Sequence, residues 1–333
     1  MTTIALVGCA HIHTPGFVKR INDNPEIDCT LVWDHDAARA ALRADELGAA
    51  TTETLDAIWE DDRISAVVVC SETNRHEELV MPAVAAGKHM FVEKPLGMGA
   101  KDAWSMARAI EAAELVFQTG YFMRSAANNR CIRALLHGNA LGRITRIRHS
   151  NCHAGALKGW FDTDWRWMAD PSVAGCGAFG DLGTHSLDLL MWWMGDVAEV
   201  AADIRVITGR YAGCDESGEA LMRFDSGAIG TLAAGWVDQA NSAQCMISGT
   251  EGYLHVTDGT LHVKSEKLEG ADGGPWTDLP EALPHAFDLF LAAITGATDV
   301  PLVTPSEAAA RSAVMEAMYL SSRERCWATP ERA

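Results

Sequence analysis

The stretch that decides the fold is IALVGCAHIHTPGF, residues 4–17. Its first four residues form an apolar run, typical of a buried strand in a parallel sheet, and Gly8 follows that run directly. Thr14 and Pro15 then favour a helix start, because a capping hydroxyl followed by proline in the first turn is a common helix beginning. A strand, a glycine turn and a helix in this order predict the first unit of a doubly wound parallel sheet.

The turn between this strand and helix differs from the usual phosphate-binding loop. Dinucleotide folds have G-x-G-x-x-G here, whereas this chain has Gly8, Ala10 and His13. The methyl group of Ala10 still lets the backbone approach a pyrophosphate, but His13 should push the helix away from the strand or point outward. Free N–H groups at the helix start can still receive a phosphate. We therefore expect an atypical pyrophosphate turn with cofactor contacts from Gly8, Ala10, His11, Ile12 and His13.

The same turn contains the sequence His-x-His, so a metal site is an alternative interpretation. His11 and His13 after a first strand resemble the pattern of zinc amidohydrolases, whose barrel needs further ligands at the ends of later strands. His76 and His89 are available, but the second half of the chain lacks the strand–helix alternation of a barrel. We therefore expect no metal site.

Strand-like and helix-like segments alternate through the first third of the chain. Predicted strands lie at 29–33, 66–70, 89–92 and 116–119, and predicted helices at 37–47, 77–86 and 101–113. Short links between them predict an α/β fold with an N-terminal Rossmann-type doubly wound parallel sheet. We expect a nucleotide-binding domain over residues 1–121.

The pattern changes in residues 122–333. A long alternating stretch at 144–152 and a bulky helix at 184–194 precede strands at 200–208, 219–224, 228–234, 244–248, 252–256 and 261–264, with helices at 284–295 and 305–321. The turn sequences DSG (225–227) and TDG (257–259) indicate hairpins, whereas the composition of GADGGP (270–275) indicates a flexible loop. We expect a C-terminal α+β domain with a large, mostly antiparallel open sheet that binds substrate and mediates oligomerisation.

Charge and cysteine usage exclude several classes of protein. The formal net charge of −18 repels phosphate backbones, so we expect no nucleic-acid partner. Nine scattered cysteines without a C-x-x-C pair argue against disulfides and a structural zinc site. No apolar run approaches the roughly 20 residues of a membrane span. We expect a cytoplasmic protein with no membrane partner.

Asp34 closes the second predicted strand, where a carboxylate can accept both hydroxyls of an adenosine ribose. His35 and Asp36 follow it, so the extra phosphate of NADP would meet negative charge. Arg39 is the one nearby group that would favour that phosphate. The sequence therefore predicts NAD, with NADP less favoured, and contacts from Asp34, His35 and Arg39.

Residues 71–97, SETNRHEELVMPAVAAGKHMFVEKPLG, carry a more specific pattern. The loop with Asn74 and His76, the AGKH turn at 86–89 and the EKP triplet at 93–95 resemble the glucose–fructose oxidoreductase / inositol dehydrogenase / rhizopine-catabolism (Gfo/Idh/MocA) family. The resemblance implies that Glu93 lies near the nicotinamide, that a cis peptide precedes Pro95, and that Lys94 polarises the substrate oxygen. It also implies cofactor contacts from Ser71, Thr73, Asn74, His76, Glu93 and Lys94.

A second stretch, WRWMADPSVAGCGAFGDLGTHSLDLLMWWMGD at 165–196, resembles another conserved segment of that family, although Cys176 replaces a common glycine. The resemblance implies a catalytic triad of Lys94, Asp181 and His185. Asp181 and His185 are four residues apart, so on a helix they would share one face. We therefore expect the carboxylate to orient the imidazole, with Asp188 tuning it or holding substrate hydroxyls. Predicted substrate contacts are Lys94, Tyr121, Arg124, Lys158, Trp160, Trp165, Arg166, Asp181 and His185.

Taken with these motifs, the resemblance implies an NAD(P)-dependent oxidoreductase that acts on a secondary alcohol of a sugar, sugar derivative or cyclitol. His185 would serve as acid and base. Two alternatives stay open: an NAD-dependent glycosidase that uses transient oxidation, and a non-catalytic nucleotide-binding sensor, which should lack the equivalents of Lys94 or His185. The family also implies a homodimer or homotetramer formed through the open sheet.

Overall fold

The computed structural model describes residues 1–333 and has two sheets. The first sheet has six parallel strands in the order β3-β2-β1-β4-β5-β6. Their bounds are β1 (Thr2–Val7), β2 (Ile27–Trp33), β3 (Ala50–Thr51), β4 (Ile64–Val69), β5 (His89–Val92) and β6 (Phe117–Thr119). The predicted Rossmann-type sheet is confirmed, and its strand order reverses between β1 and β4, where such sheets bind ligands.

Five helices connect these strands: α1 (Thr14–Asn22), α2 (Ala37–Leu47), α3 (Asp56–Trp59), α4 (His76–Ala85) and α5 (Ala100–Ala112). Local chemistry explains the bounds of α2. The Asp36 carboxylate accepts hydrogen bonds from the first backbone N–H groups, and Gly48 ends the helix at φ 65°, a left-handed conformation that favours glycine. The short elements β3 and α3 were not predicted, because two-residue strands and single-turn helices leave little periodicity in a sequence.

The second sheet has eight strands in the order β14-β13-β12-β11-β7-β10-β9-β8. Their bounds are β7 (Ile144–Cys152), β8 (Val197–Arg205), β9 (Ser217–Phe224), β10 (Ile229–Gly235), β11 (Ala243–Gly249), β12 (Gly252–Thr257), β13 (Thr260–Ser265) and β14 (Asp272–Pro275). Only β7 and β10 pair in parallel, so the predicted mostly antiparallel sheet is confirmed. The loop predicted at 270–275 is wrong in part, because residues of β14 pair with β13 at the sheet edge.

Helix α8 (Ala178–Met194) packs on one face of this sheet against β7 and β10. It begins six residues before the predicted start, because Gly180 and Gly183 disfavoured a helix in the sequence. The structure needs both glycines: an added Cβ at Gly183 would lie 3.3 Å from Leu232 and Met315, and one at Gly180 would lie 2.3 Å from Cys176. The opposite face of the sheet exposes large apolar side chains of Leu221, Ile229, Met246 and Tyr253.

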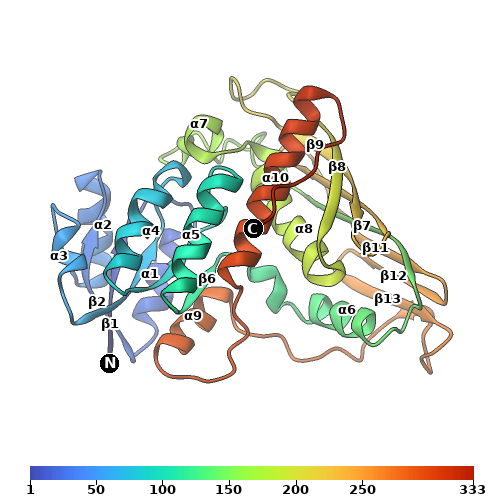
Figure 1. The fold of residues 1–333 in the computed structure, drawn as a ribbon, viewed down its shortest axis with the longest axis horizontal. Helices are drawn as coiled ribbons and strands as arrows, with labels where there is room; N and C mark the ends of the chain where they lie inside the picture. Colours follow the sequence, from blue (N-terminus) through green and yellow to red (C-terminus); the bar gives the residue numbers. More distant parts are fainter.

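The remaining helices are α6 (Ala127–His137), α7 (Pro171–Ala174), α9 (Ala286–Ile294) and α10 (Pro305–Glu324). Although α9 comes from the C-terminal part, it packs on β5 and β6 of the first sheet. There Phe287 stacks on Phe17 at 4.5 Å between ring centroids and meets Phe91 edge-on at 5.0 Å. Helix α10 lies between the two sheets and contacts both α5 and β8 (Figure 1). No helix combines the length and apolar character that a membrane span requires.

Candidate active site

Lys94 lies in the turn after β5, and a cis peptide joins it to Pro95, as the family resemblance implied. Its side chain is buried, and its Nζ atom donates a hydrogen bond of 2.6 Å to Oδ1 of Asp181 on α8. Burial opposes the charge on Lys94, but the carboxylates of Asp181 and Glu93 outweigh it and raise the pKa of Lys94. Burial likewise opposes the charge on Asp181, but Lys94 outweighs it and lowers the pKa of Asp181 to about 2. An ion pair therefore joins the two domains.

His185 lies one helical turn after Asp181 and is buried. Burial, reinforced by the ammonium of Lys94, lowers the pKa of His185 well below its usual value, so the imidazole is neutral near neutral pH. The predicted contact with Asp181 is not formed. The second oxygen of Asp181 instead accepts a hydrogen bond of 3.2 Å from Trp236 Nε1, and the buried Nδ1 atom of His185 has no partner. The Lys94 ammonium attracts the Asp181 carboxylate more strongly than the neutral imidazole does, because it carries a full charge.

Glu93 is fully buried between the EKP turn and the nucleotide loop. Its Oε2 atom accepts a hydrogen bond of 2.8 Å from the Lys94 backbone N–H, and its Oε1 atom lies 2.9 Å from His13 Nδ1 and 3.7 Å from His11 Nδ1. An added Cβ at Gly120 would lie 2.7 Å from Glu93 Oε2, so the first residue after β6 must be small. His13 thus points across the loop toward Glu93 and does not wedge helix α1 away from β1.

Gly8 makes the tight turn that the sequence predicts. Its φ is 80°, and an added Cβ would lie 2.6 Å from the Cβ of Ser71, so only glycine fits. The predicted cap by Thr14 is wrong: His13 occupies the N-cap position without a side-chain cap, and Thr14 is the first residue of α1. The buried Thr14 hydroxyl has no partner in the protein. This hydroxyl and the helix N-terminus suit a phosphate group.

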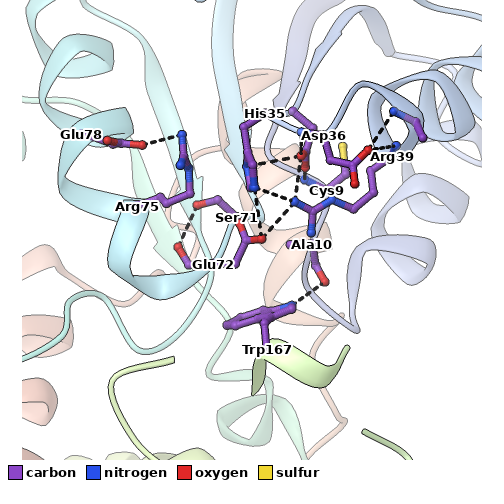
Figure 2. Close-up of polar contacts among 12 residues, drawn as sticks. Cys9, Ala10, His35, Asp36, Arg39, Ser71, Glu72, Arg75, Glu78 and Trp167 are labelled. Carbon is purple, nitrogen blue, oxygen red and sulfur yellow. Dashed lines mark hydrogen bonds and ion pairs between the residues drawn. The ribbon is translucent and has the colours of Figure 1, made fainter. Parts of the chain in front are cut away.

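Asp34 lies at the end of β2 and is buried. One of its oxygens accepts a hydrogen bond of 2.6 Å from the Cys9 backbone N–H, and the other lies 3.0 Å from Arg39 Nη2. Arg39 also donates a hydrogen bond of 2.9 Å to Glu72, and its Nη2 atom lies 3.1 Å from His35 Nε2 (Figure 2). Two carboxylates therefore neutralise the guanidinium at the predicted adenosine end of the site.

Two residues of this region were not predicted. Glu72 follows β4, which is the neighbour of β1 at the point where the strand order reverses, and this position is the signal that would have found it. Trp167 comes from the second domain and donates a hydrogen bond of 3.0 Å from Nε1 to the carbonyl of Ala10 (Figure 2). No spacing in the sequence indicates this contact, because the two residues are 157 positions apart.

The other predicted cofactor residues differ in their exposure and in their partners. Ser71 and Thr73 are buried in the loop after β4, whereas Asn74 is exposed. His76 supports the EKP turn, because its buried Nδ1 atom pairs with the Leu96 carbonyl at 3.1 Å, whereas its Nε2 atom has no partner in the protein. Its contact with the cofactor stays a prediction. Ile12 packs against the core of the second domain, so the nucleotide loop lies at the domain junction.

Several predicted substrate residues have structural partners within the protein. The hydroxyl of the buried Tyr121 lies 2.9 Å from the Thr184 hydroxyl. Arg124 donates a hydrogen bond of 2.8 Å to Asp188 and lies 3.0 Å from Glu307. These contacts give Tyr121, Arg124 and Asp188 structural roles at the domain junction, and their contacts with substrate stay predictions.

The loop residues predicted to select substrate lie apart from the ion pair. Lys158 and Trp160 are exposed, Trp165 is half-buried, and the guanidinium of Arg166 lies 4.5 Å from the centroid of the Tyr211 ring. A small cavity beside the ion pair is lined instead by His11, Thr73, Lys94, Pro95, Trp167, Met168, Ala174, Cys176 and Asp181. The structure thus brings Lys94 and Asp181 to one cavity but leaves the four loop residues outside it.

The residues present fit a dinucleotide. The cradle at Gly8 excludes a Cβ, the Thr14 hydroxyl and one Glu72 oxygen are buried without partners, and Asp34 lies at the end of β2. These groups follow one line along the carboxyl ends of the strands, from the predicted adenosine end to Glu93 and Lys94. Family models match both parts of the chain: residues 2–121 match an oxidoreductase family with an NAD-binding Rossmann fold, and residues 129–255 match the GFO/IDH/MocA C-terminal domain.

The chain belongs to the GFO/IDH/MocA oxidoreductase family.

Relatives within this family act on sugars and cyclitols. A 1,5-anhydro-D-fructose reductase of Ensifer adhaerens is 29% identical over 222 residues, which cover 66% of this chain and 65% of that protein. A myo-inositol 2-dehydrogenase of Thermotoga maritima is 31% identical over 182 residues, which cover 52% of this chain and 50% of that protein. The matches thus span between half and about two thirds of these relatives.

Solved structures of the family share the fold over the whole chain. Levoglucosan dehydrogenase in complex with NADH and levoglucosan has a TM-score of 0.84 at 20% identity, with 99% of both chains covered. GenD2 from gentamicin A biosynthesis, in complex with NAD, has a TM-score of 0.81 at 24% identity, with 99% of this chain and 96% of that chain covered.

Proposed function

We propose that this chain is an NAD-dependent oxidoreductase that transfers a hydride between a secondary alcohol of a sugar, sugar derivative or cyclitol and the nicotinamide. The observation that carries the proposal is the buried Lys94–Asp181 ion pair at the domain junction, with a neutral histidine one helical turn away. A bound nicotinamide supplies the hydride acceptor in oxidation and the hydride donor in reduction. The named activities of the family relatives support the substrate class.

Lys94 polarises the substrate oxygen in this proposal. An ammonium has three N–H groups, and one of them donates to Asp181. The other two remain for the hydroxyl that reacts, where the positive charge stabilises the developing alkoxide. Asp181 is a positioning residue, because it fixes the direction of the lysine side chain and is itself held by Trp236.

His185 takes the hydroxyl proton during oxidation and returns it during reduction. Its low pKa keeps the imidazole neutral and able to accept a proton. Because Nδ1 is sealed from solvent, Nε2 is the nitrogen left for proton exchange with a substrate. The rings of Tyr121 and Phe122 lie 6.2 Å and 5.1 Å from the imidazole ring and fix its place.

The adenosine end supports NAD over NADP. A ribose 2′-phosphate would meet the carboxylates of Asp34, Asp36 and Glu72, and Arg39 is already paired with two of them. Repulsion between like charges disfavours the phosphate. The two hydroxyls of an unmodified ribose can instead donate hydrogen bonds to carboxylate oxygens.

The test is turnover with a panel of sugars, sugar acids and inositols, followed through the absorbance of reduced nicotinamide with NAD and NADP. Lys94→Ala should lower kcat about 10²–10³-fold, and His185→Ala about 10²–10⁴-fold. Near-normal rates in either variant would reject the assignment. Product formation without net reduced nicotinamide would favour a glycosidase that oxidises transiently.

We also propose that the exposed face of the second sheet forms a homodimer or homotetramer interface. Four large apolar side chains on strands β9, β10, β11 and β12 are exposed there, and a groove lined by residues of β7, β9, β10 and β11 crosses the sheet. Exposed apolar clusters of this kind mark protein contacts. Light scattering of the purified protein tests this proposal directly.

A further inference from the structure

His11, His13 and Glu93 bring three potential metal ligands together where the nucleotide loop meets the turn after β5. One ligand atom from each residue lies within 4.8 Å of the other two. Two of the three side chains are buried, and His13 is partly exposed. The sequence predicts these three residues as cofactor contacts, and the catalytic roles proposed above, which use Lys94 and His185, assign no reaction step to them.

We propose that His11, His13 and Glu93 form a binding site for one divalent transition-metal ion of the zinc class. This inference goes beyond the proposed oxidoreductase function and does not depend on it. The sequence favoured no metal because a barrel fold, with its additional ligands, was absent. The fold supplies a third ligand by another route, since parallel strands β1, β4 and β5 are neighbours and place Glu93 beside a turn 80 residues earlier.

The two distances from Glu93 to the histidine nitrogens are close to those expected around a shared ion. Zn²⁺ lies roughly 2.0–2.2 Å from histidine nitrogen and carboxylate oxygen, so two ligand atoms of one ion lie roughly 3.0–3.6 Å apart. In the structure, Glu93 Oε1 lies 2.9 Å from His13 Nδ1 and 3.7 Å from His11 Nδ1. The ligand atoms of His11 and His13 lie within 4.8 Å of each other, and His11 Nδ1 accepts a hydrogen bond of 3.2 Å from the His13 backbone N–H. For all three residues to reach one ion, the imidazoles must turn toward each other and this hydrogen bond must open.

The charge of the pocket also favours a cation. Glu93 is a fully buried carboxylate, and a buried charge needs a compensating partner. The nearest fixed positive charge, on Lys94, is already paired at 2.6 Å with Asp181. Glu93 itself is held by the Lys94 backbone N–H and by His13, neither of which is a fixed positive charge. A divalent ion at the histidines would place a full positive charge beside it.

The ligand types select the metal class. Two imidazoles and one carboxylate suit Zn²⁺, Co²⁺, Ni²⁺ or Fe²⁺, whereas Mg²⁺ and Ca²⁺ prefer oxygen ligands throughout. Three protein ligands leave at least one coordination position for water or another small ligand. His11 also lines the small cavity that contains Lys94 and Asp181, so an ion would lie at the edge of that cavity.

The experiment is a metal titration of the full chain after removal of bound metal with a chelator. We expect Zn²⁺ to bind in calorimetry with one site per chain, and Co²⁺ to give the visible absorption bands of a low-symmetry nitrogen–oxygen site. His13→Ala and Glu93→Gln should each weaken Zn²⁺ binding at least about tenfold, because even indirect partners of metal ligands contribute that much.

His35→Ala is the matched control. His35 and His13 have nearly equal side-chain exposure, 38% and 37%, and both lie along the nucleotide site. His35→Ala should bind Zn²⁺ like the unmodified chain. A circular dichroism spectrum shows whether each variant is folded. The Co²⁺ spectrum tests the site in the unmodified chain, where no substitution can disturb folding.

Three results would overturn the proposal. They are no saturable Zn²⁺ binding to the unmodified chain, equal weakening by His35→Ala and His13→Ala, and full affinity in Glu93→Gln. If Zn²⁺ fails to bind but the chain still reduces NAD with a polyol, the metal site is wrong while the oxidoreductase function stands.

Discussion

The Nζ atom of Lys94 and the Oδ1 atom of Asp181 lie 2.6 Å apart across the junction of the two domains. Lys94 follows a strand of the nucleotide-binding sheet, whereas Asp181 lies in the first turns of the helix that packs on the second sheet. Each domain therefore contributes one half of the ion pair. The alignment of the domains and the direction of the lysine side chain depend on the same contact.

Breaking one half of this pair should destabilise the protein. Asp181→Leu leaves the ammonium of Lys94 buried and unpaired, which costs about 3–5 kcal/mol of unfolding free energy. The double variant Lys94→Met/Asp181→Leu should recover most of that loss, because no charge then remains buried. Urea unfolding of the unmodified chain, both single variants and the double variant measures the effect. Equal stability of Asp181→Leu and the unmodified chain would show that the pair is open in solution.

The Lys94–Asp181 ion pair predicts how the stability of the folded chain changes with pH. The pKa of Asp181 is about 2 in the folded chain, below the roughly 3.9 of an aspartate in an unfolded chain. The folded state therefore binds fewer protons, and its extra stability is present above about pH 4 and is lost as pH falls toward 2. Asp181→Asn lacks this contribution, so the stability difference between it and the unmodified chain should shrink over that window. Thermal unfolding midpoints at pH 2.5–6 test this expectation.

His185 should remain neutral in mildly acidic solution. Burial and the nearby ammonium of Lys94 lower its pKa, so Lys94→Met should raise that pKa toward its ordinary value. Lys101→Met, at an exposed lysine on α5, is the control and should leave it unchanged. Nuclear magnetic resonance of the imidazole, assigned through His185→Asn, measures both values. An unchanged pKa in Lys94→Met would place the ammonium too far from the histidine to act on it.

The sequence predicted most of the elements that surround this site. Apolar runs and glycine stops placed β5 at residues 89–92 and α2 at residues 37–47, and both bounds agree with the structure. Such elements follow from local chemistry alone. The start of α8 was missed because its glycines are needed for packing against β10 and α10, which a propensity argument cannot include.

The sequence predicted which residues form the site better than it predicted which of them contact one another. Spacing along one helix indicated that Asp181 would hold His185, yet Asp181 contacts Lys94, which is 87 positions away in the sequence. Glu93 and Trp167 likewise meet the nucleotide loop only through the arrangement of strands and domains. Sequence spacing predicts which residues can be neighbours on one helix. In the folded site, the full charge of the Lys94 ammonium decides that Lys94 is the partner of Asp181.

The adenosine end predicts a preference between the two dinucleotides. NAD should bind at least about tenfold more tightly than NADP, a difference of about 1.4 kcal/mol, because Glu72 and Asp34 already pair with Arg39 at the predicted adenosine end. Glu72→Gln should narrow that ratio by freeing Arg39 from one carboxylate. Quenching of tryptophan fluorescence by each dinucleotide gives the affinities. Tighter binding of NADP by the unmodified chain would contradict this arrangement.

The exposed face of the second sheet predicts assembly. Met246 on β11 is 40% exposed on that face, and a charge there would be desolvated in an interface, so Met246→Glu should yield monomers. Leu42→Glu is the matched control: Leu42 is 52% exposed but lies on α2, at the opposite end of the molecule from β11 (Figure 1). Light scattering at micromolar concentration should find dimers or tetramers for the unmodified chain and Leu42→Glu, and monomers only for Met246→Glu. A monomeric unmodified chain would contradict the interface, and equal dissociation by both variants would place the contact elsewhere.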